Sequence, residues 1–180
     1  MLVVAIALGV STLTGTDDPP VSDDDSPGLS VAPAPDYIQP SEEDWEALLP
    51  RLQKVVDAAP GDANALRKLA LAYHNLDRLD EAASIYERLL AIEEDAVLRD
   101  RLANVLRDQG DLAGAEAAYR KAIADDPSLA PAYLNLAELL WRQGRDKEAL
   151  AVISEGLEVA PEEGRASFED ARAVLEGAAD

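Results

Sequence analysis

Cysteine is absent from this sequence of 180 residues, and histidine occurs once, as His74. Without cysteine the chain has no disulfide bond, no cysteine-ligated zinc, no thiol nucleophile and no lipid-modified cysteine anchor. A metal site built on the single histidine would need carboxylate ligands around it. The sequence also lacks a phosphate-binding loop, a nucleophile elbow and the spacing of zinc ligands. We therefore predict a protein that is not an enzyme, with no catalytic residue, no metal and no cofactor.

Basic and aromatic residues are scarce as well. There are 16 lysines and arginines against 36 aspartates and glutamates, which gives a formal net charge of −20. Nucleic acid and anionic membrane surfaces are poor partners for such a chain, because both attract basic protein surfaces. Aromatic residues make up 4% of the sequence, although hydrophobic residues reach 48%. Alanine and leucine supply most of the apolar content, which predicts an all-α fold of closely packed helices.

The first 16 residues, "MLVVAIALGVSTLTGT", carry no charged side chain. A bilayer-spanning helix needs roughly 20 residues, and a signal peptide usually starts with basic residues, which this segment lacks. Three interpretations stay open: the end of a membrane helix that starts upstream, an atypical signal peptide, or a buried or frayed helix. We expect residues 1–16 to be a membrane anchor or a signal, which would make the rest of the chain extracytoplasmic. A cytoplasmic location is the alternative.

Residues 17–40, "DDPPVSDDDSPGLSVAPAPDYIQP", differ sharply in composition from residues 41–180. They contain six prolines and a run of aspartates, with few large apolar side chains. Such a segment cannot bury enough apolar surface to offset the entropy that it would lose on ordering. We therefore predict an extended, disordered acidic linker here.

Residues 41–62 predict a helical lead-in. Ser41 and Asp44 have the spacing of a capping box, which marks the start of a helix. Apolar residues then recur at helical spacing, namely Trp45, Leu48, Leu49, Leu52, Val55 and Val56. Pro50 lies inside this stripe, and we expect it either to kink the helix or to divide it into two short helices.

Residues 63–163 contain three similar segments with periods of 33 and then 34 residues, when Ala63, Ala96 and Ala130 are aligned as position 1. Small residues share positions 8 and 20, which are Ala70, Ala103 and Ala137, then Ala82, Ala115 and Ala149. Larger apolar residues share positions 7, 11 and 24, which are Leu69, Leu102 and Leu136, then Tyr73, Leu106 and Leu140, then Tyr86, Tyr119 and Ile153. The repetition predicts one structural unit that occurs three times.

Each unit has the pattern of two helices joined by a turn. Alanines at positions 8 and 20 let the two helices approach closely, and the larger residues fill the space beside that contact. Gly110 and Gly144, at position 15, are suited to end the first helix, while Pro127 and Pro161, at position 32, stop the second. A single pair of helices cannot bury its apolar face alone, so the units are expected to stack.

In these positions the chain resembles the tetratricopeptide repeat (TPR) family, whose motif has the same spacing. The resemblance covers residues 63–163 and implies a helical-hairpin solenoid of three repeats. Repeat 1 departs from the pattern, because Asp77 replaces the glycine, Glu94 replaces the proline, and the repeat is one residue shorter. We therefore expect an irregular junction with repeat 2. Residues 164–180 are expected to form a C-terminal capping helix.

The resemblance also implies a concave groove lined by the first helix of each repeat. The residues expected to bind a partner there are Asn64, Arg67, Lys68, Leu71, His74 and Asn75 from repeat 1, Asp100, Arg101, Asn104, Arg107 and Asp108 from repeat 2, and Leu134, Asn135, Glu138, Trp141 and Arg142 from repeat 3. Five of these residues are basic and three are acidic, so we interpret the groove as mildly basic. The alternative is that these are compensating charges on an ordinary surface.

Single residues in the groove allow more than one interpretation. Some TPR proteins hold a partner's C-terminal carboxylate with basic residues and asparagines. Arg67, Asn104 and Asn135 resemble part of that set, but Leu71 and Pro131 depart from it. Trp141 is either an anchor that stacks on a bound peptide or a residue that packs against the C-terminal helix, and His74 is expected to line the surface. The acidic run 93–95 is interpreted as a solvated turn.

The function predicted from the sequence is a non-enzymatic protein–protein interaction scaffold that binds a protein or peptide in the groove. A small-molecule ligand is not expected, and membrane contact is expected only through the N-terminal segment. Together with that segment and the linker, "LLPRLQKVVDAAPGDANALRKLALAY" resembles the periplasmic TPR part of cytochrome c maturation proteins, which implies an apocytochrome client. The alternative is a structural accessory subunit of a larger enzyme or secretion complex.

Overall fold

A computed structural model describes residues 41–177, and this part of the chain contains helices and turns but no strand. The elements in chain order are α1 (Glu42–Ala58), α2 (Ala63–Asn75), α3 (Leu79–Ile92), α4 (Ala96–Asp108), α5 (Leu112–Asp125), α6 (Ala130–Arg142), α7 (Asp146–Val159), the 3-10 helix η1 (Glu162–Gly164) and α8 (Arg165–Gly177). The expected anchor or signal segment, the acidic linker and residues 178–180 lie outside the described residues.

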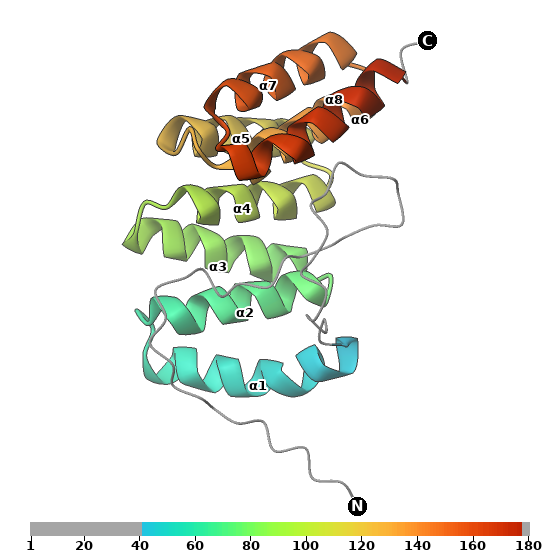
Figure 1. Ribbon diagram of the computed structural model, residues 1–180. Helices are drawn as coiled ribbons and strands as arrows, with labels where there is room; N and C mark the ends of the chain where they lie inside the picture. Colours follow the sequence, from blue (N-terminus) through green and yellow to red (C-terminus); the bar gives the residue numbers. More distant parts are fainter. Residues whose placement is uncertain (1–40, 178–180) are drawn as a thin grey trace, which may run out of the picture.

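The helices form a stack that runs from α1 at one end to α7 and α8 at the other (Figure 1). Within the stack, α2 pairs with α3, α4 with α5, and α6 with α7. The first helix of each pair begins at Ala63, Ala96 or Ala130 and has 13 residues. These starting points coincide with position 1 of the sequence repeat. The predicted fold class, an all-α solenoid of three repeats with a helix on either side, is therefore confirmed.

The capping box at the start of α1 is present as the sequence predicts. The Asp44 N–H donates to Ser41 Oγ at 3.3 Å, and the Ser41 N–H donates to Asp44 Oδ2 at 2.9 Å. Division of the helix at Pro50 is wrong, since α1 continues through it. Pro50 cannot donate to the carbonyl of Glu46, but both residues are exposed, so water can satisfy that carbonyl and the helix persists.

The core is built by the positions that the repeat brings together. All six alanines at positions 8 and 20 are fully buried, and so are the residues at position 24. Repeat 2 is the exception, because Leu102 and Leu106 at positions 7 and 11 are only partly buried. As a result the core consists of two clusters that meet in α4, where Val105 belongs to the N-terminal cluster and Ala103 to the C-terminal one.

The turn inside each repeat uses a left-handed backbone at position 15. Gly110 has a φ of 83° and Gly144 a φ of 73°. Asp77, which replaces glycine in repeat 1, takes the same conformation with a φ of 55°. Aspartate is one of the few residue types besides glycine that tolerate this region, so the departure in repeat 1 leaves the turn unchanged.

The last helix, α8, covers the end of the C-terminal cluster with three buried side chains: Phe168, Ala171 and Leu175. The Phe168 ring meets Tyr133 edge to face, with ring centroids 6.2 Å apart. It also lies directly over Gly156 of α7, where a Cβ atom would stand 2.3 Å from Phe168 Cε1. Among the described helices, none is both long and apolar enough to cross a membrane.

Candidate functional site

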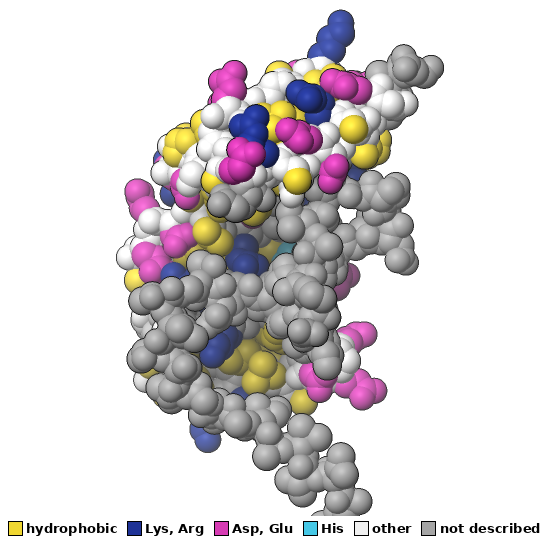
Figure 2. Space-filling model, in the orientation of Figure 1, with side chains coloured by type: hydrophobic (Ala, Val, Ile, Leu, Met, Phe, Trp, Pro, Cys, Tyr) yellow, Lys and Arg dark blue, Asp and Glu magenta, His cyan; other side chains and the backbone are white. Residues whose placement is uncertain are grey.

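The candidate site is the surface formed by α2, α4 and α6, called here the inner surface. Direct packing of α4 on α6 places the first helices of the repeats side by side. Figure 2 shows side chains of both signs on one face of the molecule, mixed over the last helices, with basic side chains also visible in its middle. Several of the residues expected to bind a partner are joined to one another on the inner surface by hydrogen bonds and ion pairs.

One of these links joins α4 to α6 through a buried carboxylate. Asp100 is 6% exposed, and its Oδ1 accepts a hydrogen bond of 3.0 Å from the Asn135 amide. Burial raises the pKa of Asp100 to about 6, even though Asn135 and the nearby guanidinium groups of Arg101 and Arg107 favour the charged form. Asp100 therefore titrates close to neutral pH, unlike an aspartate in water.

A second link joins α2 to α4 at the ends of both helices. The His74 ring Nε2 lies 2.7 Å from Asp108 Oδ2, and Arg107 Nε donates to Asp108 Oδ1 at 2.9 Å. Burial alone would raise the pKa of Asp108, but the hydrogen bonds from His74 and Arg107 outweigh it and hold the pKa below its ordinary value. Asp108 is consequently a charged acceptor at neutral pH. His74 serves here as its partner.

Two further contacts order the surface within the second and third repeats. The Tyr119 hydroxyl of α5 donates to Asn104 Oδ1 at 2.5 Å, and burial raises the pKa of this phenol far above its ordinary value. Glu138, which is 9% exposed, accepts from Arg142 Nε at 3.0 Å and from Arg142 Nη2 at 2.8 Å. Tyr119 was not among the expected site residues, because position 24 is a core position of the repeat. The hydroxyl is the only polar atom of its side chain, so the sequence offered little sign of a polar contact here.

The basic residues of the inner surface are largely neutralised from within. Arg107 and Arg142 pair with Asp108 and Glu138, and Arg67 forms an ion pair with Glu93 in the turn before α4. The turn at residues 93–95 also makes specific contacts: Glu93 pairs with Arg67, and the Asp95 side chain caps α4 by accepting from the Leu98 N–H. The pair of Arg67 and Glu93 was not predicted from the sequence, because the two residues are 26 positions apart in the chain.

Lys68 differs from those arginines, because it is exposed and forms no ion pair with any residue in the described part of the chain. Five other residues, from α2, α3 and α4, line a small depression: Arg67, Leu71, Tyr86, Leu98 and Arg101. Its three uncharged lining residues are all buried, with Tyr86 at 1%, Leu98 at 2% and Leu71 at 6% exposure. The lining therefore consists of two arginines and of side chains that the core already covers.

Other expected site residues lie outside these contacts. Asn64 is exposed at the start of α2, where its backbone N–H donates to the Asp62 cap. The Asn75 amide donates to the Leu71 carbonyl of its own helix. Leu134 is buried in the C-terminal cluster, and Trp141 is partly buried against that cluster. Trp141 therefore packs against a cluster that includes residues of α8, and its role as a stacking anchor stays a prediction.

The chemistry available on the inner surface is recognition by charge and hydrogen bonds. Within residues 41–177, no group of three or more histidines and carboxylates is arranged to hold a metal ion. The contacts described above join acids to bases and amides, and none of them pairs a hydroxyl nucleophile with a general base.

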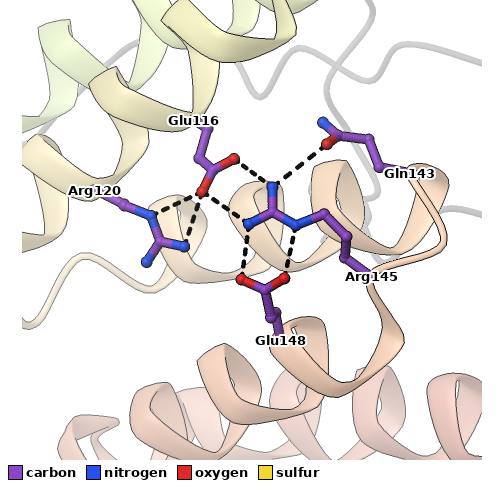
Figure 3. A network of polar contacts seen from close by, with 5 residues as sticks. All are labelled: Glu116, Arg120, Gln143, Arg145 and Glu148. Carbon is purple, nitrogen blue, oxygen red and sulfur yellow. Dashed lines mark hydrogen bonds and ion pairs between the residues drawn. The ribbon is translucent and has the colours of Figure 1, made fainter.

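A second polar network lies away from the inner surface and joins α5 to the start of α7 (Figure 3). Arg145 stands between two carboxylates, donating to Glu116 Oε2 at 2.5 Å and to Glu148 Oε2 at 2.7 Å. Arg120 also donates to Glu116, at 3.0 Å from Nε. The hydrogen bonds from Arg145 lower the pKa of Glu116, although burial opposes them. This network fastens repeat 2 to repeat 3.

Comparison with protein-family models gives three matches within the chain. A model described as TPR repeat matches residues 103–144, and two models described as tetratricopeptide repeat match residues 43–96 and 130–163. A TPR repeat-containing protein of Methanocaldococcus jannaschii is 27% identical over 92 residues, which are 48% of this chain and 29% of that protein. The chain thus spans less than a third of the length of that relative.

Solved structures similar to this one share its fold. The MamA protein has a TM-score of 0.63 at 18% identity, covering 76% of this chain and 74% of its own. YrrB, described as a TPR protein with an unusual peptide-binding site, has a TM-score of 0.57 at 20% identity, covering 75% and 69%. The Yersinia enterocolitica secretion chaperone SycD, solved with a peptide of the translocator YopD, has a TM-score of 0.57 at 15% identity, covering 65% and 94%.

Proposed function

Because the chain belongs to the tetratricopeptide repeat family, we propose that it is a non-enzymatic interaction scaffold that holds a segment of a partner protein on its inner surface. The observation that carries this proposal is the inner surface itself, where charged and amide side chains of successive repeats meet, as in the contacts of Asn135 with Asp100 and of His74 with Asp108. Such a surface offers charge-assisted hydrogen bonds to an extended or helical segment. The peptide-binding descriptions of YrrB and SycD are consistent with it.

The absence of cysteine allows a direct test, because a single introduced thiol is the only one in the chain. Lys68→Cys places it at an exposed position of α2, and Lys147→Cys places it on the exposed side of α7. Each variant is labelled with a benzophenone maleimide and irradiated with a partner that the parent chain captures repeatedly.

We expect the partner to crosslink from residue 68 and not from residue 147. The same peptide of the partner should be found attached in independent preparations. Crosslinking from residue 147 alone would place the interface elsewhere and would favour the accessory-subunit function instead.

Residues 1–16 lie outside the described part of the chain, so a membrane anchor or signal, with the repeats extracytoplasmic, is proposed from the sequence alone. The apocytochrome client is likewise proposed from the sequence alone. Fractionation of cells that make the full chain tests the first proposal. Recovery of the chain in the soluble cytoplasmic fraction would contradict it.

A further inference from the structure

α1 has the place of a second helix in the repeat pattern. It packs on α2 as α3 packs on α4 and as α5 packs on α6. Pro60 stands three residues before α2, and the proline at position 32 of repeat 2 stands three residues before α6 in the same way. Counting back from Pro60 as position 32 gives Leu48 position 20, Leu52 position 24 and Val55 position 27. α1 is therefore the second half of a repeat whose first helix is missing from residues 41–177.

The positions that the first helix helps to bury in a complete repeat are open in α1. Positions 20 and 27 are buried in all three repeats, where they hold Ala82, Ala115 and Ala149, then Leu89, Ala122 and Gly156. In α1, Leu48 at position 20 is 36% exposed and Val55 at position 27 is 47% exposed. Leu52 lies between them on the same face of the helix and is 8% exposed. We call these three residues the open face of α1.

The open face is turned away from the side of α1 that packs on α2. Trp45, Leu49 and Val56 are buried in the N-terminal cluster. Leu48 and Val55 each come one residue before a member of that set, which turns them about 100° around the helix axis. The buried indole N–H of Trp45 also has no hydrogen-bond partner in the described part of the chain. α1 therefore keeps one apolar side and one buried donor that nothing in residues 41–177 satisfies.

Neither the residues directly before α1 nor a second copy of the chain fits this place. By the repeat spacing, the missing helix would fall at residues 29–41, where the sequence has Pro33, Pro35 and Pro40. Prolines inside a helix remove hydrogen bonds and clash with the preceding turn. Two copies would set the large residues of one open face against those of the other, and each chain has a formal net charge of −20. A helix of another protein meets neither obstacle.

The size and charge of the open face define the helix that fits it. Leu48 is larger than the alanines that hold position 20 in the complete repeats, so the residue opposite it must be alanine or glycine. Asp44 lies one turn before Leu48 and Arg51 one turn after it, and both are exposed. Helices joined by a short turn run antiparallel, so a helix in the place of the first helix has its C-terminal half beside Asp44. A base there, and an acid beside Arg51, complement these charges.

From these observations we propose that the open face of α1 binds a helix of a partner protein in the place of the missing first helix. The bound helix runs antiparallel to α1 and sets alanine or glycine against Leu48. It carries a base in its C-terminal half and an acid in its N-terminal half. This interaction goes beyond the proposed function, because it uses the end of the stack (Figure 1) and not the inner surface.

Selection from a displayed library tests the proposal without knowledge of the partner. The library holds helices of about 18 residues, long enough to keep some helical structure alone, with one face varied. The full chain is the bait, and the double variant Leu48→Lys, Val55→Lys removes helices that bind elsewhere. We expect helices with alanine or glycine on the varied face that bind the parent chain about tenfold or more tightly than the double variant. A selection that yields no such helix would overturn the proposal.

Val174→Lys is the matched control for the introduced charges. Val174 is 44% exposed on α8, at the other end of the stack, and its replacement should leave binding unchanged. Circular dichroism checks that the double variant keeps its helices, and Val55→Lys alone takes its place if it does not. Equal loss of binding in the Val174 variant would show a nonspecific effect of charge and would contradict a site on α1.

The direction of the bound helix is tested by disulfide formation. The chain has no cysteine, so Val55→Cys supplies a single thiol near the C-terminal end of α1. A selected helix with cysteine at its N-terminal end should form a disulfide with this thiol faster than the same helix with cysteine at its C-terminal end. The reverse preference would contradict the antiparallel arrangement.

Two other occupants would give results of their own. If residues 1–16 covered the open face, a variant with both Ala5→Cys and Val55→Cys would form a disulfide within one chain. If a second copy covered it, light scattering would give the mass of a dimer, and Val55→Lys would restore the mass of a monomer. Either result would overturn the proposal. Failure of the proposed use of the inner surface is separate, because crosslinking from residue 68 tests that surface and the Leu48 and Val55 variants test α1.

Discussion

Asp100 makes the stability of the helical stack depend on pH. Its pKa of about 6 in the folded chain lies above the value of about 3.9 for an unfolded aspartate. The folded state therefore holds the proton more tightly, and the stability that the protonated group contributes is lost as pH rises from about 4 through 6. At neutral pH the charged carboxylate is destabilising, although Asn135 donates to it.

Replacing the Asp100 carboxylate with a neutral amide should recover the stability that the charged group removes at neutral pH. We expect Asp100→Asn to raise the free energy of unfolding at pH 7.5 by about 1–3 kcal/mol, since about two pKa units are involved. The gain should be smaller at pH 5, where Asp100 is largely protonated. Thermal unfolding followed by circular dichroism at both pH values measures this, with the exposed Asp170→Asn as control. A loss of stability at pH 7.5 would contradict the argument.

The left-handed turn at position 15 provides a second test at single residues. A Cβ atom on Gly110 would meet nothing within 4 Å, so Gly110→Ala changes only the backbone preference. We expect it to cost about 1–2 kcal/mol, the cost of a left-handed conformation for an ordinary residue. Asp77→Gly should change stability by less than about 0.5 kcal/mol, because relief of strain is offset by the entropy of glycine. Urea unfolding of both variants compares them, and equal losses would show that the turn is not conformationally selective.

Individual side-chain contacts were only partly predictable. The sequence places Asp100, Asn135, His74 and Asp108 on one surface, but it does not say which of them meet. The repeat contains a usable signal, because position 12 of repeat 1 meets position 13 of repeat 2 in the pair formed by His74 and Asp108. The partner of Arg67 was hidden, since Glu93 comes from a turn whose path depends on the packing of α3 against α4.

At the scale of the helices, the contact between α7 and α8 reverses the effect expected when a helical glycine is replaced by alanine. Alanine inside a helix is ordinarily better than glycine by roughly 1 kcal/mol. At Gly156, however, the added methyl group would collide with the buried ring of Phe168. We expect Gly156→Ala to destabilise by about 1–3 kcal/mol, measured by thermal unfolding. Gly177→Ala, where the methyl group meets nothing, is the control, and a gain in stability at residue 156 would show that α8 can shift freely.

Equivalent leucines in different repeats should differ in their contribution. Leu136 and Leu102 both hold position 7, but Leu136 is 1% exposed and Leu102 is only partly buried. We expect Leu136→Ala to cost about 2–5 kcal/mol and Leu102→Ala less than half of that. Chemical unfolding of the two variants gives the comparison. Equal costs would mean that repeat 2 packs as tightly as repeat 3.

The helix boundaries were well predicted for a physical reason. Alanines at positions 8 and 20 must face each other wherever two helices pack closely, so their spacing fixes the register of every repeat. Glycine or aspartate at position 15 and proline at position 32 then mark the ends. The effect of Pro50 was less predictable, because it depends on whether solvent reaches the freed carbonyl of Glu46.

At the scale of the whole molecule, the division of the core in α4 should limit how far a local change spreads. In a repeat stack each unit is stabilised mainly by its neighbours. We expect Leu136→Ala to speed amide hydrogen exchange in α6, α7 and α8 more than in α1 and α2, because the two ends belong to different clusters. Mass spectrometry of exchanged peptides resolves these segments. Uniform acceleration would show one cooperative unit instead.

The same division has a mechanical consequence. A stack of helices behaves as an elastic rod, and its bending stiffness is lowest where apolar contact across a layer is thinnest. The two clusters meet in α4, where Leu102 and Leu106 each pack against a different one. A bend there changes the width of the depression between α2 and α4, while the hydrogen bond of Asp100 with Asn135 holds α4 and α6 together. We therefore expect a bend of the stack at α4 to change the spacing of α2 and α4 more than that of α4 and α6.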